Sequence, residues 1–405
     1  MNILFLHPNF PAQFKRPCIE LAKQKKHQIK FICQTHYGRH IDGVEKLILK
    51  GKGSHEKTEA SSRQEYEKTL YRAEAYRESF ELLKQSSWVP DIIIGHSGWG
   101  CGLYLKRAFP SVPFIAYLEW WFDPQSDLIQ SMKQSEYFHI NDQLLDKLWA
   151  RNMPAAFEIT TADYIVAPTS WQMEQLPLSL QKNCHVIHDI VDQTIFFPEP
   201  QKLSPTPLIT YGTRGMEPMR AFPQFINLLP KLLRKWPQLS VQIAGNDTIS
   251  YGGVRPKEGS WKKWALKLLE KENLSDRVSW IGELPLKKYA SWLKSSWCHI
   301  YLSEPFVTSW SFIEALHCQI PMVASNTNAT NEFKNLNDNL ITADHNNQAE
   351  MLEAINVKLR FIGNFKSKGE SNAIAEQIKT PPFLKEKSMM GLAGFIADVE
   401  AATKV

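Results

Sequence analysis

Short apolar runs alternate with amphipathic stretches along both halves of the chain. In the first half the apolar runs predict strands at 3–6, 29–33, 92–95, 114–117, 164–167 and 186–187. Helices are expected between them, near 13–26, 54–85, 101–107 and 142–158. The second half repeats the rhythm, with strands at 208–211, 240–244, 278–281, 299–302 and 322–324 and helices at 221–235, 261–271, 286–295 and 309–317. This alternation predicts an α/β protein of two Rossmann-like, doubly wound domains that face each other across a cleft.

A proline-containing segment, 193–207, separates the two halves. Proline lacks a backbone N–H and breaks helices and central strands, so this segment is expected to be a linker. The expected domains are therefore 1–192 and 208–384. The C-terminal segment 385–405 is expected to return as a helix and complete the first domain.

Composition and charge narrow the class of protein. The 405 residues are 43% apolar and 22% charged, which excludes a mostly disordered or collagen-like chain. The net charge is only +5, so no nucleic-acid partner is expected. Scattered single cysteines favour a reducing cytoplasm, and no apolar run is long enough to span a membrane. The protein is expected in the cytoplasm, either free or attached peripherally to the inner face of the plasma membrane.

The segment YGTRGMEPMR, 211–220, follows a predicted strand and carries two arginines. Gly212 and Gly215 permit a tight turn around Thr213. Arg214 and Arg220 could clamp a diphosphate with charge-assisted hydrogen bonds, or be two solvated surface arginines. Gly245, which follows the next predicted strand, is assigned to the same candidate diphosphate site.

A second candidate anion site opens the predicted helix 309–317. Thr308 and Ser309 stand where an N-cap belongs, and Trp310 and Ser311 begin the helix. Free N–H groups at a helix N-terminus suit a phosphate. Glu314, further along the same helix, could accept hydrogen bonds from ribose hydroxyls or be an ordinary surface glutamate.

The segment GHSGWG, 95–100, places His96 and Ser97 at the end of a buried strand. It differs by one residue from the G-x-S-x-G nucleophile elbow of α/β-hydrolases, because Trp99 replaces the last glycine. His96 could contact a substrate, act as a base, or be a structural histidine.

Several motifs, in this order, resemble those of family-4 retaining glycosyltransferases with the GT-B fold. VIHDIVDQTIFFP resembles the interdomain signature of that family, GTRGMEPMR its diphosphate-gripping loop, and SFIEALHCQIPMVAS its donor-site signature. PFVTSW resembles a bacterial subgroup reading P-F-V-x-S-W-S. Two departures are visible. Phe306 stands where the family has its first glutamate, with Glu304 nearby, and Glu119 stands about where the family has a histidine.

The resemblance implies a retaining hexosyl transfer from a UDP-, GDP- or ADP-linked sugar, with no metal and no cofactor. The leaving diphosphate takes the proton of the acceptor, and the catalytic set implied is Arg214, Arg220, Glu314, His96 and Glu119. The donor contacts implied are Gly212, Thr213, Gly215, Gly245, Glu304, Thr308, Ser309, Trp310 and Ser311. The acceptor is a glycan, a lipid-linked molecule or a small molecule, as in polysaccharide biosynthesis.

Two other functions remain open from the sequence. One is a catalytically inactive GT-B subunit that binds a partner glycosyltransferase or a glycan, suggested by Phe306 and the missing histidine. The other is a hydrolase that uses Ser97. The basic segment 13–30 is expected either to dock on an anionic membrane surface or to be a solvated helix; its basic residues are Lys15, Arg16, Lys23, Lys25, Lys26 and Lys30.

Overall fold

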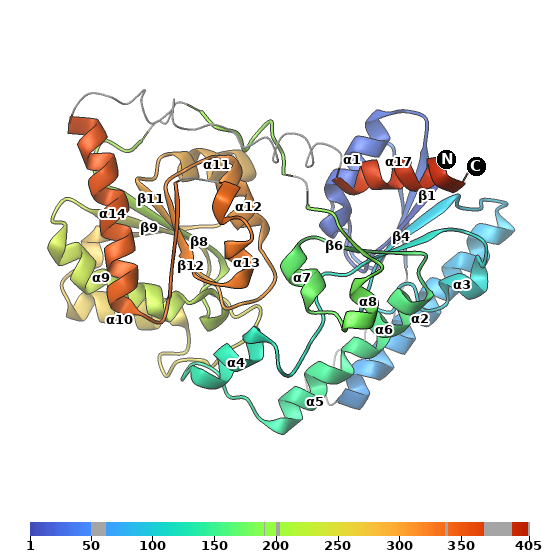
Figure 1. The fold of residues 1–405 in the computed structure, drawn as a ribbon, viewed down its shortest axis with the longest axis horizontal. Helices are drawn as coiled ribbons and strands as arrows, with labels where there is room; N and C mark the ends of the chain where they lie inside the picture. The colour runs from blue at the N-terminus through green and yellow to red at the C-terminus, as the bar shows by residue number, and fades with distance from the viewer. Residues whose placement is uncertain (50–61, 190, 200–202, 337–338, 368–390, 404–405) are drawn as a thin grey trace. The chain divides into compact units, whose positions relative to one another are not determined.

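The computed structural model describes residues 1–49, 62–189, 191–199, 203–336, 339–367 and 391–403, and these form two compact units (Figure 1). The first unit falls within Met1–Ser126, Asn141–Ile190 and Lys387–Val405. The second falls within Asp127–Ile140 and Val191–Glu386. Parts of the expected segments lie outside the described residues: 54–61, 190, 200–202, 337–338, 368–390 and 404–405.

The first unit is built on a parallel sheet of seven strands. The strand order is β3 (Val44–Ile48), β2 (Gln28–Cys33), β1 (Asn2–Leu6), β4 (Ile92–His96), β5 (Phe114–Tyr117), β6 (Tyr164–Ala167) and β7 (Cys184–Val186). Its central strands are continuous apolar runs because helices cover both faces of the sheet. Its helical segments are η1 (Ala12–Phe14), α1 (Lys15–Lys23), α2 (Ser62–Gln85), α3 (Leu105–Ala108), α5 (Asp142–Ala150), α6 (Asn152–Thr161), α7 (Ser170–Glu174), α8 (Leu178–Gln181) and α17 (Gly391–Thr403).

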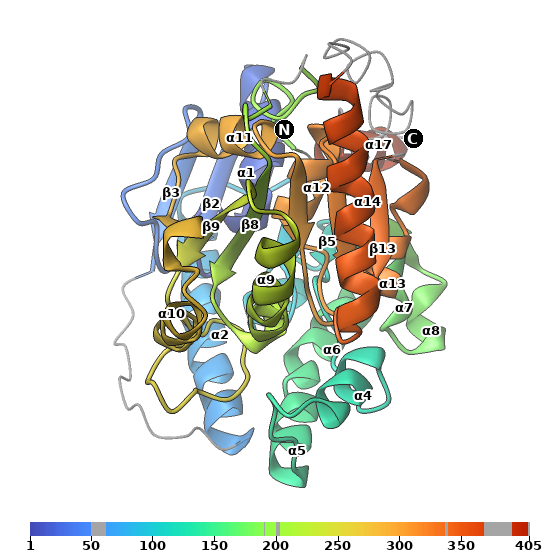
Figure 2. The same cartoon turned by 90° about the vertical axis from the view of Figure 1, so that its left-hand side faces the viewer.

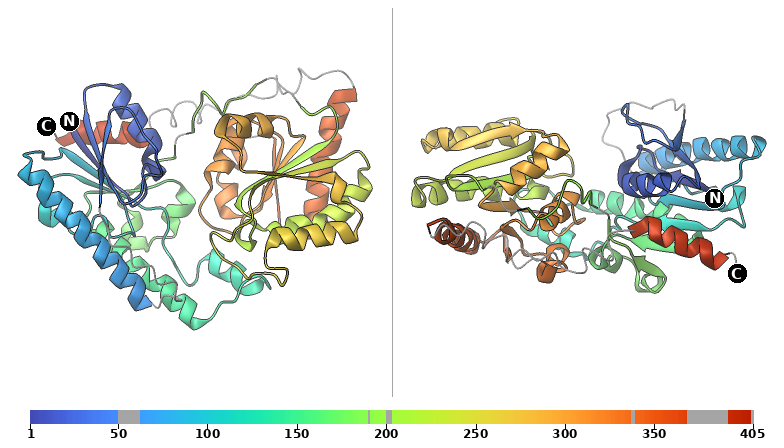
Figure 3. Two further views of the ribbon diagram at one scale, coloured as in Figure 1. Left: turned by 180° about the vertical axis from the view of Figure 1, so that it is seen from behind. Right: turned by 90° about the horizontal axis from the view of Figure 1, so that it is seen from above.

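The C-terminal helix α17 packs beside α1 on one face of this sheet (Figure 3). Ile396 of α17 and Leu21 of α1 share a buried cluster with Ile3 and Phe5 of β1. On the opposite face Tyr76 and other side chains of α2, α3 and α6 form a second cluster. The last helix of the chain thus belongs to the core of the first unit.

The second unit is built on a parallel sheet of six strands. The strand order is β10 (Val278–Gly282), β9 (Ser240–Asn246), β8 (Leu208–Gly215), β11 (Cys298–Tyr301), β12 (Met322–Ser325) and β13 (Leu340–Ala343). Figure 2 shows helices α9 (Phe222–Lys235) and α14 (Gln348–Ser367) side by side on one face of this sheet, and α10 (Trp261–Lys271) packs on the same face. Helices α11 (Leu286–Lys294) and α12 (Trp310–His317) cover the opposite face. Its helical segments are α4 (Asp127–Gln134), η2 (Pro218–Arg220), α9 (Phe222–Lys235), α10 (Trp261–Lys271), η3 (Ser275–Arg277), α11 (Leu286–Lys294), α12 (Trp310–His317), α13 (Asn328–Asn331), η4 (Lys334–Leu336) and α14 (Gln348–Ser367). The expected parallel α/β architecture of both halves is confirmed.

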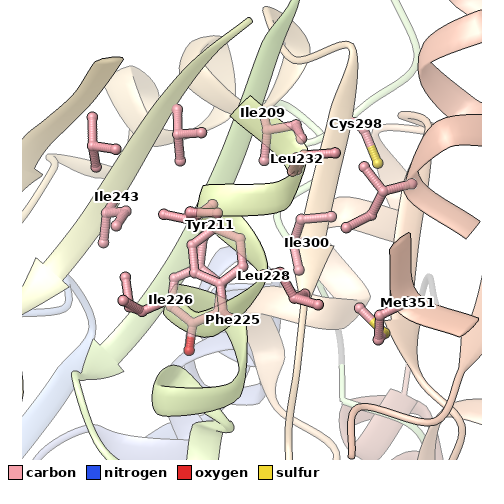
Figure 4. Packing of buried hydrophobic residues seen from close by; sticks show 14 of the residues in the cluster. Ile209, Tyr211, Phe225, Ile226, Leu228, Leu232, Ile243, Cys298, Ile300 and Met351 are labelled. Atoms are coloured by element: carbon pink, nitrogen blue, oxygen red, sulfur yellow. The ribbon is translucent and has the colours of Figure 1, made fainter. Parts of the chain in front are cut away.

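The core of the second unit is organised around two stacked aromatic rings. Tyr211 of β8 and Phe225 of α9 lie with ring centroids 4.4 Å apart and planes 11° from parallel (Figure 4). Both side chains are buried, and the Tyr211 hydroxyl donates to the backbone oxygen of Arg220 at 2.6 Å. The stack therefore connects the hydrophobic core to the loop that follows β8.

The segment Asp127–Ile140 comes from the first half of the chain but packs in the second unit. The Tyr137 ring lies edge-on to Trp261 at 5.5 Å, and the Tyr137 carbonyl accepts from the N–H of Val254. Asn328 donates to the Asp127 carboxylate at 2.8 Å. The polar pattern of this segment did not predict α4, because the surface that covers its few apolar residues is distant in sequence.

Several expected elements differ from those observed. The expected helix 142–158 is two helices, α5 and α6, and Pro154 in the first turn of α6 cannot donate a backbone hydrogen bond. The expected helix 101–107 is reduced to the four residues of α3, because a run of turns precedes it. β8 continues to Gly215, four residues past its expected end. β3, β13, α4, α7, α8 and α14 were not predicted.

The basic segment 13–30 does not form one helix. α1 ends at Lys23, and Lys30 lies on β2, where its ammonium is 3.0 Å from Glu45 and 5.1 Å from the centre of the Trp88 ring. The basic side chains are therefore divided between a helix, a turn and a strand. None of the described helices is both long enough and apolar enough to cross a membrane.

We expect Phe225→Ala to lower the free energy of unfolding by about 3–5 kcal/mol, because it removes a buried ring and leaves a cavity under Tyr211. Phe157→Ala is the matched control, since the Phe157 side chain is half-exposed, and it should cost less than about 1 kcal/mol. Urea denaturation of both variants measures the difference. Equal stabilities would contradict the central place of the aromatic stack.

Candidate active site

In each sheet the chain order reverses between two central strands, β1 and β4 in the first unit and β8 and β11 in the second. Loops diverge at such a point and leave room for a ligand at the carboxyl ends of the strands. The predicted site residues gather at both of these points.

At the end of β8 two arginine side chains approach one tyrosine. The guanidinium of Arg220 lies 5.0 Å from the centre of the Tyr251 ring, and that of Arg214 lies 5.9 Å from it. Arg214 Nη1 also donates to the Tyr251 hydroxyl at 3.4 Å. The structure thus brings Arg214 and Arg220 together at a residue that the sequence did not suggest.

The two arginines differ in how they are held. Arg220 is buried in the short helix η2, and its Nη1 donates to Ser303 Oγ, just after β11, at 3.1 Å. Arg214 is exposed near the end of β8. Arg214 therefore lies on the strand and Arg220 in the short helix that follows, because β8 extends further than its apolar run. Arg220 is fixed in position, whereas Arg214 is free to adapt to a ligand.

Glu217 fixes the loop that carries Tyr251. Its buried Oε2 accepts the backbone N–H groups of Ser250 and Tyr251 at 2.7 Å each and that of Gly252 at 3.3 Å. Burial raises the pKa of Glu217, and the three N–H groups oppose that rise. Sequence reasoning missed Glu217, because the loop that buries it lies more than thirty residues later in the chain.

The predicted glycines let these strand ends approach closely. A Cβ on Gly215 would lie 2.6 Å from the Thr248 carbonyl oxygen. Gly245 has φ +132°, and a Cβ there would collide with the carbonyl of Thr213. Gly212 faces the Trp292 ring instead. Gly215, Gly245 and Thr213 therefore act through backbone packing.

The first turn of α12 has no side-chain cap. Ser309 is the N-cap residue, but its Oγ donates to the Tyr301 hydroxyl at 3.0 Å and lies 2.8 Å from Ser311 Oγ. Thr308 is buried and donates to the Ala329 carbonyl at 3.2 Å, whereas Trp310 is exposed. The first backbone N–H groups of α12 therefore have no side-chain acceptor from the N-cap and could bind an anion.

The two glutamates near α12 have different surroundings. The Glu304 carboxylate is buried, accepts from Ser131 Oγ of α4 at 2.5 Å, and lies 3.3 Å from His345 Nε2. Its backbone N–H donates to the Met219 carbonyl. Glu304 thus connects α4, η2 and the segment of His345 next to Arg220. Glu314 is half-buried near Tyr289, whose pKa is raised well above its usual value by burial first and by the Glu314 charge second.

In the first unit the ends of β1, β4 and β5 bring together His7, His96 and Glu119. The His7 and His96 rings are perpendicular, with centroids 4.9 Å apart, and His96 Nε2 lies 3.4 Å from Glu119 Oε2. Burial, and then the neighbouring His96, lowers the pKa of His7 well below its usual value. His7 was not predicted, although its place directly after the first strand was a usable signal.

A buried carboxylate also holds the loop after β4. Glu158 of α6 accepts the backbone N–H groups of Gly98 and Gly102 at 2.7 Å each. Burial raises the pKa of Glu158 to about 7, although both hydrogen bonds act to lower it. Ser97 Oγ is buried and has no hydrogen-bond partner in the described structure, so no Ser–His dyad is formed there. Within the same described ranges, no three His, Cys, Asp or Glu side chains are grouped to hold a metal ion.

Two parallel doubly wound units with sites at their switch points define the GT-B class, and known proteins agree with this assignment. The description "Glycosyl transferase family 4 group" matches residues 25–196, and "Glycosyl transferases group 1" matches residues 194–360. Two glycosyltransferase domain descriptions thus match successive stretches that together cover most of the chain, and the expected GT-B fold is confirmed. Among curated proteins no match to the sequence was found.

Solved structures share the fold over the whole chain. A sucrose-phosphate synthase from Thermosynechococcus elongatus is 12% identical, with a TM-score of 0.70 over 100% of this chain and 98% of that one. HepE from Anabaena, solved with UDP and glucose, is 14% identical, with a TM-score of 0.65 over 99% and 100%. WaaG, a glycosyltransferase of lipopolysaccharide biosynthesis, is 12% identical, with a TM-score of 0.64 over 98% and 99%.

We expect Glu217→Ala to destabilise the second unit and to loosen the loop of Tyr251. Each buried N–H that loses its acceptor costs about 1–3 kcal/mol. Glu217→Gln is the matched control, because the amide keeps one acceptor oxygen. Thermal unfolding and tyrosine fluorescence quenching would compare the two variants, and equal effects of both would contradict the role of the N–H bonds.

Proposed function

We propose that the protein transfers a glycosyl group from a nucleotide-diphosphate sugar to an acceptor hydroxyl with retention of anomeric configuration. The observation that carries this proposal is the convergence of Arg214 and Arg220 on Tyr251 at the β8/β11 switch point. The match to glycosyltransferase domains supports the same chemistry.

Two kinds of group would stabilise the departing diphosphate. The guanidinium groups supply positive charge, and Arg220 is already oriented by Ser303 and Tyr251 before a ligand binds. The uncapped N–H groups of α12 supply a partial positive charge. In the proposed step the bond from the anomeric carbon to the diphosphate oxygen breaks and a bond to the acceptor oxygen forms. The acceptor proton passes to the leaving diphosphate.

The donor would carry UDP, GDP or ADP. Support for a nucleotide comes from HepE, solved with UDP-glucose, and from starch synthase IV of Arabidopsis thaliana, solved with ADP and acarbose. We further propose a glycan, lipid-linked or small-molecule acceptor, and a cytoplasmic protein that attaches peripherally to an anionic membrane. Because the arginines already balance the diphosphate charge, the proposed reaction needs no metal ion and no cofactor.

We expect Arg220→Lys and Arg220→Ala to lower kcat/KM for the donor by about 10-fold and about 100- to 1000-fold, respectively. A lysine keeps the charge but cannot bridge Ser303 and a phosphate with a planar fork. Arg214→Lys should have a smaller effect, since Arg214 is exposed and not fixed. Lys235→Ala, on the far end of α9, is a control for a general loss of charge. Steady-state kinetics would measure these ratios, and near wild-type values for Arg220→Ala would remove it from the donor site.

Incubation with a panel of UDP-, GDP- and ADP-sugars, with released nucleotide as the signal, tests the function itself. We expect nucleotide release with one class of donor, and the same rate of release in excess EDTA. The NMR spectrum of the product should show the anomeric configuration that the sugar has in the donor. Loss in EDTA that magnesium or manganese restores would contradict metal independence. Nucleotide binding without any release would favour the catalytically inactive subunit. Phe306 is the reason for that alternative, because it stands where the family has its first glutamate. The Phe306 ring lies 5.9 Å from the Tyr251 ring, centre to centre.

A further inference from the structure

The Tyr251 side chain lies where the segments that follow three strands of the second sheet meet. Tyr251 itself belongs to the loop after β9, and its ring lies 5.9 Å from that of Phe306 in the loop after β11. Arg214 and Arg220 approach the same ring from the end of β8 and from η2. The Glu217 carboxylate accepts the backbone N–H of Tyr251, so this residue is held in place before any ligand binds.

The hydroxyl group of Tyr251 has its own proton available for a hydrogen bond. Its oxygen accepts from Arg214 Nη1 at 3.4 Å, and among the described residues no group accepts from the hydroxyl in turn. A hydroxyl that accepts from a cation becomes a stronger donor, because the cation polarises the O–H bond. The side chain is 43% exposed, so this proton can reach a bound molecule.

The two guanidinium groups beside this hydroxyl have no carboxylate partner. Arg220 is buried and donates to Ser303 Oγ, and neither Arg214 nor Arg220 forms an ion pair within the part of the chain that the structure describes. Glu217 attracts Arg220 electrostatically, but its Oε2 is occupied by three backbone N–H groups. A buried cation without a paired anion is costly, so this arrangement favours an anionic ligand.

We propose that the Tyr251 hydroxyl donates a hydrogen bond to a phosphate oxygen of the donor diphosphate, next to the contacts made by Arg214 and Arg220. This inference rests on the proposed function and adds a binding residue to it. Phosphate oxygens only accept, so they can take N–H groups from both guanidinium forks and the O–H of Tyr251 together. The phenol is uncharged, so it adds a donor without adding repulsion between the two cations. Because the diphosphate gains negative charge as the glycosyl bond breaks, this hydrogen bond is stronger in the transition state.

Two substitutions separate the hydroxyl of Tyr251 from its ring. Tyr251→Phe removes the hydroxyl alone and keeps the ring against both arginines. Tyr251→Leu removes the ring as well. If Tyr251 were only a packing residue, Tyr251→Phe would behave as the wild type and only Tyr251→Leu would differ. Tyr71→Phe is the matched control, because Tyr71 is an exposed tyrosine of α2 in the first unit.

The experiment uses the full chain in metal-free buffer, with inorganic pyrophosphate as a probe that is independent of the nucleotide base. Calorimetry reports the Kd of pyrophosphate, nucleotide release with the best sugar donor reports kcat and KM, and thermal unfolding reports Tm. We expect Tyr251→Phe to raise Kd and to lower kcat, each by about 10- to 100-fold, because a hydrogen bond to a charged group is lost. Its Tm should equal that of Tyr71→Phe, which should match the wild type in every measurement. Tyr251→Leu should weaken binding and turnover further.

Wild-type values of Kd and kcat in Tyr251→Phe would overturn this inference, and so would a Tm of Tyr251→Phe well below that of Tyr71→Phe. Nucleotide release by a wild-type protein that does not bind pyrophosphate would also overturn it and leave the proposed function standing. Pyrophosphate binding that depends on the Tyr251 hydroxyl, without release from any donor, would count against the transfer reaction and leave this anion contact standing.

Discussion

Both candidate sites depend on a buried carboxylate that accepts backbone N–H groups from a neighbouring loop. Glu158 holds Gly98 and Gly102 in the first unit, and Glu217 holds residues 250–252 in the second. Parallel strands end in loops whose N–H groups have no partner in the sheet, and a carboxylate satisfies two or three of them at once. The positions of His96 and Tyr251 follow directly from these bonds.

This arrangement has an energetic cost that depends on pH. The pKa of Glu158 is about 7 in the folded protein, against an ordinary value of 4.5, so the folded state binds its proton more tightly than the unfolded chain does. The contribution of Glu158 to stability therefore falls as the pH rises through this interval. The two N–H bonds offset part of that loss, and they keep the loop in one conformation when the carboxylate is charged.

Local sequence patterns were sufficient for the parallel α/β architecture and for the glycine-containing segment that carries Arg214 and Arg220. They were insufficient where long-range packing decides the outcome. Glu217 stands beside a proline in a polar segment, and only the loop after β9 makes it a buried residue. The polar helix α4 is stabilised by Glu304, a neighbour far along the chain. Tyr251 was overlooked for the same reason, since its arginine partners lie on β8 and η2, far earlier in the chain.

The connection between β5 and α5 serves both units. It supplies Glu119 and the Glu119 carbonyl to the polar cluster of the first unit, and a few residues later it supplies Ser131 to the Glu304 carboxylate of the second. Glu304 in turn has its backbone N–H on Met219, next to Arg220. The side chain at each end of this connection is fixed by hydrogen bonds within a different unit, Glu119 by Gln13 in the first and Ser131 by Glu304 in the second.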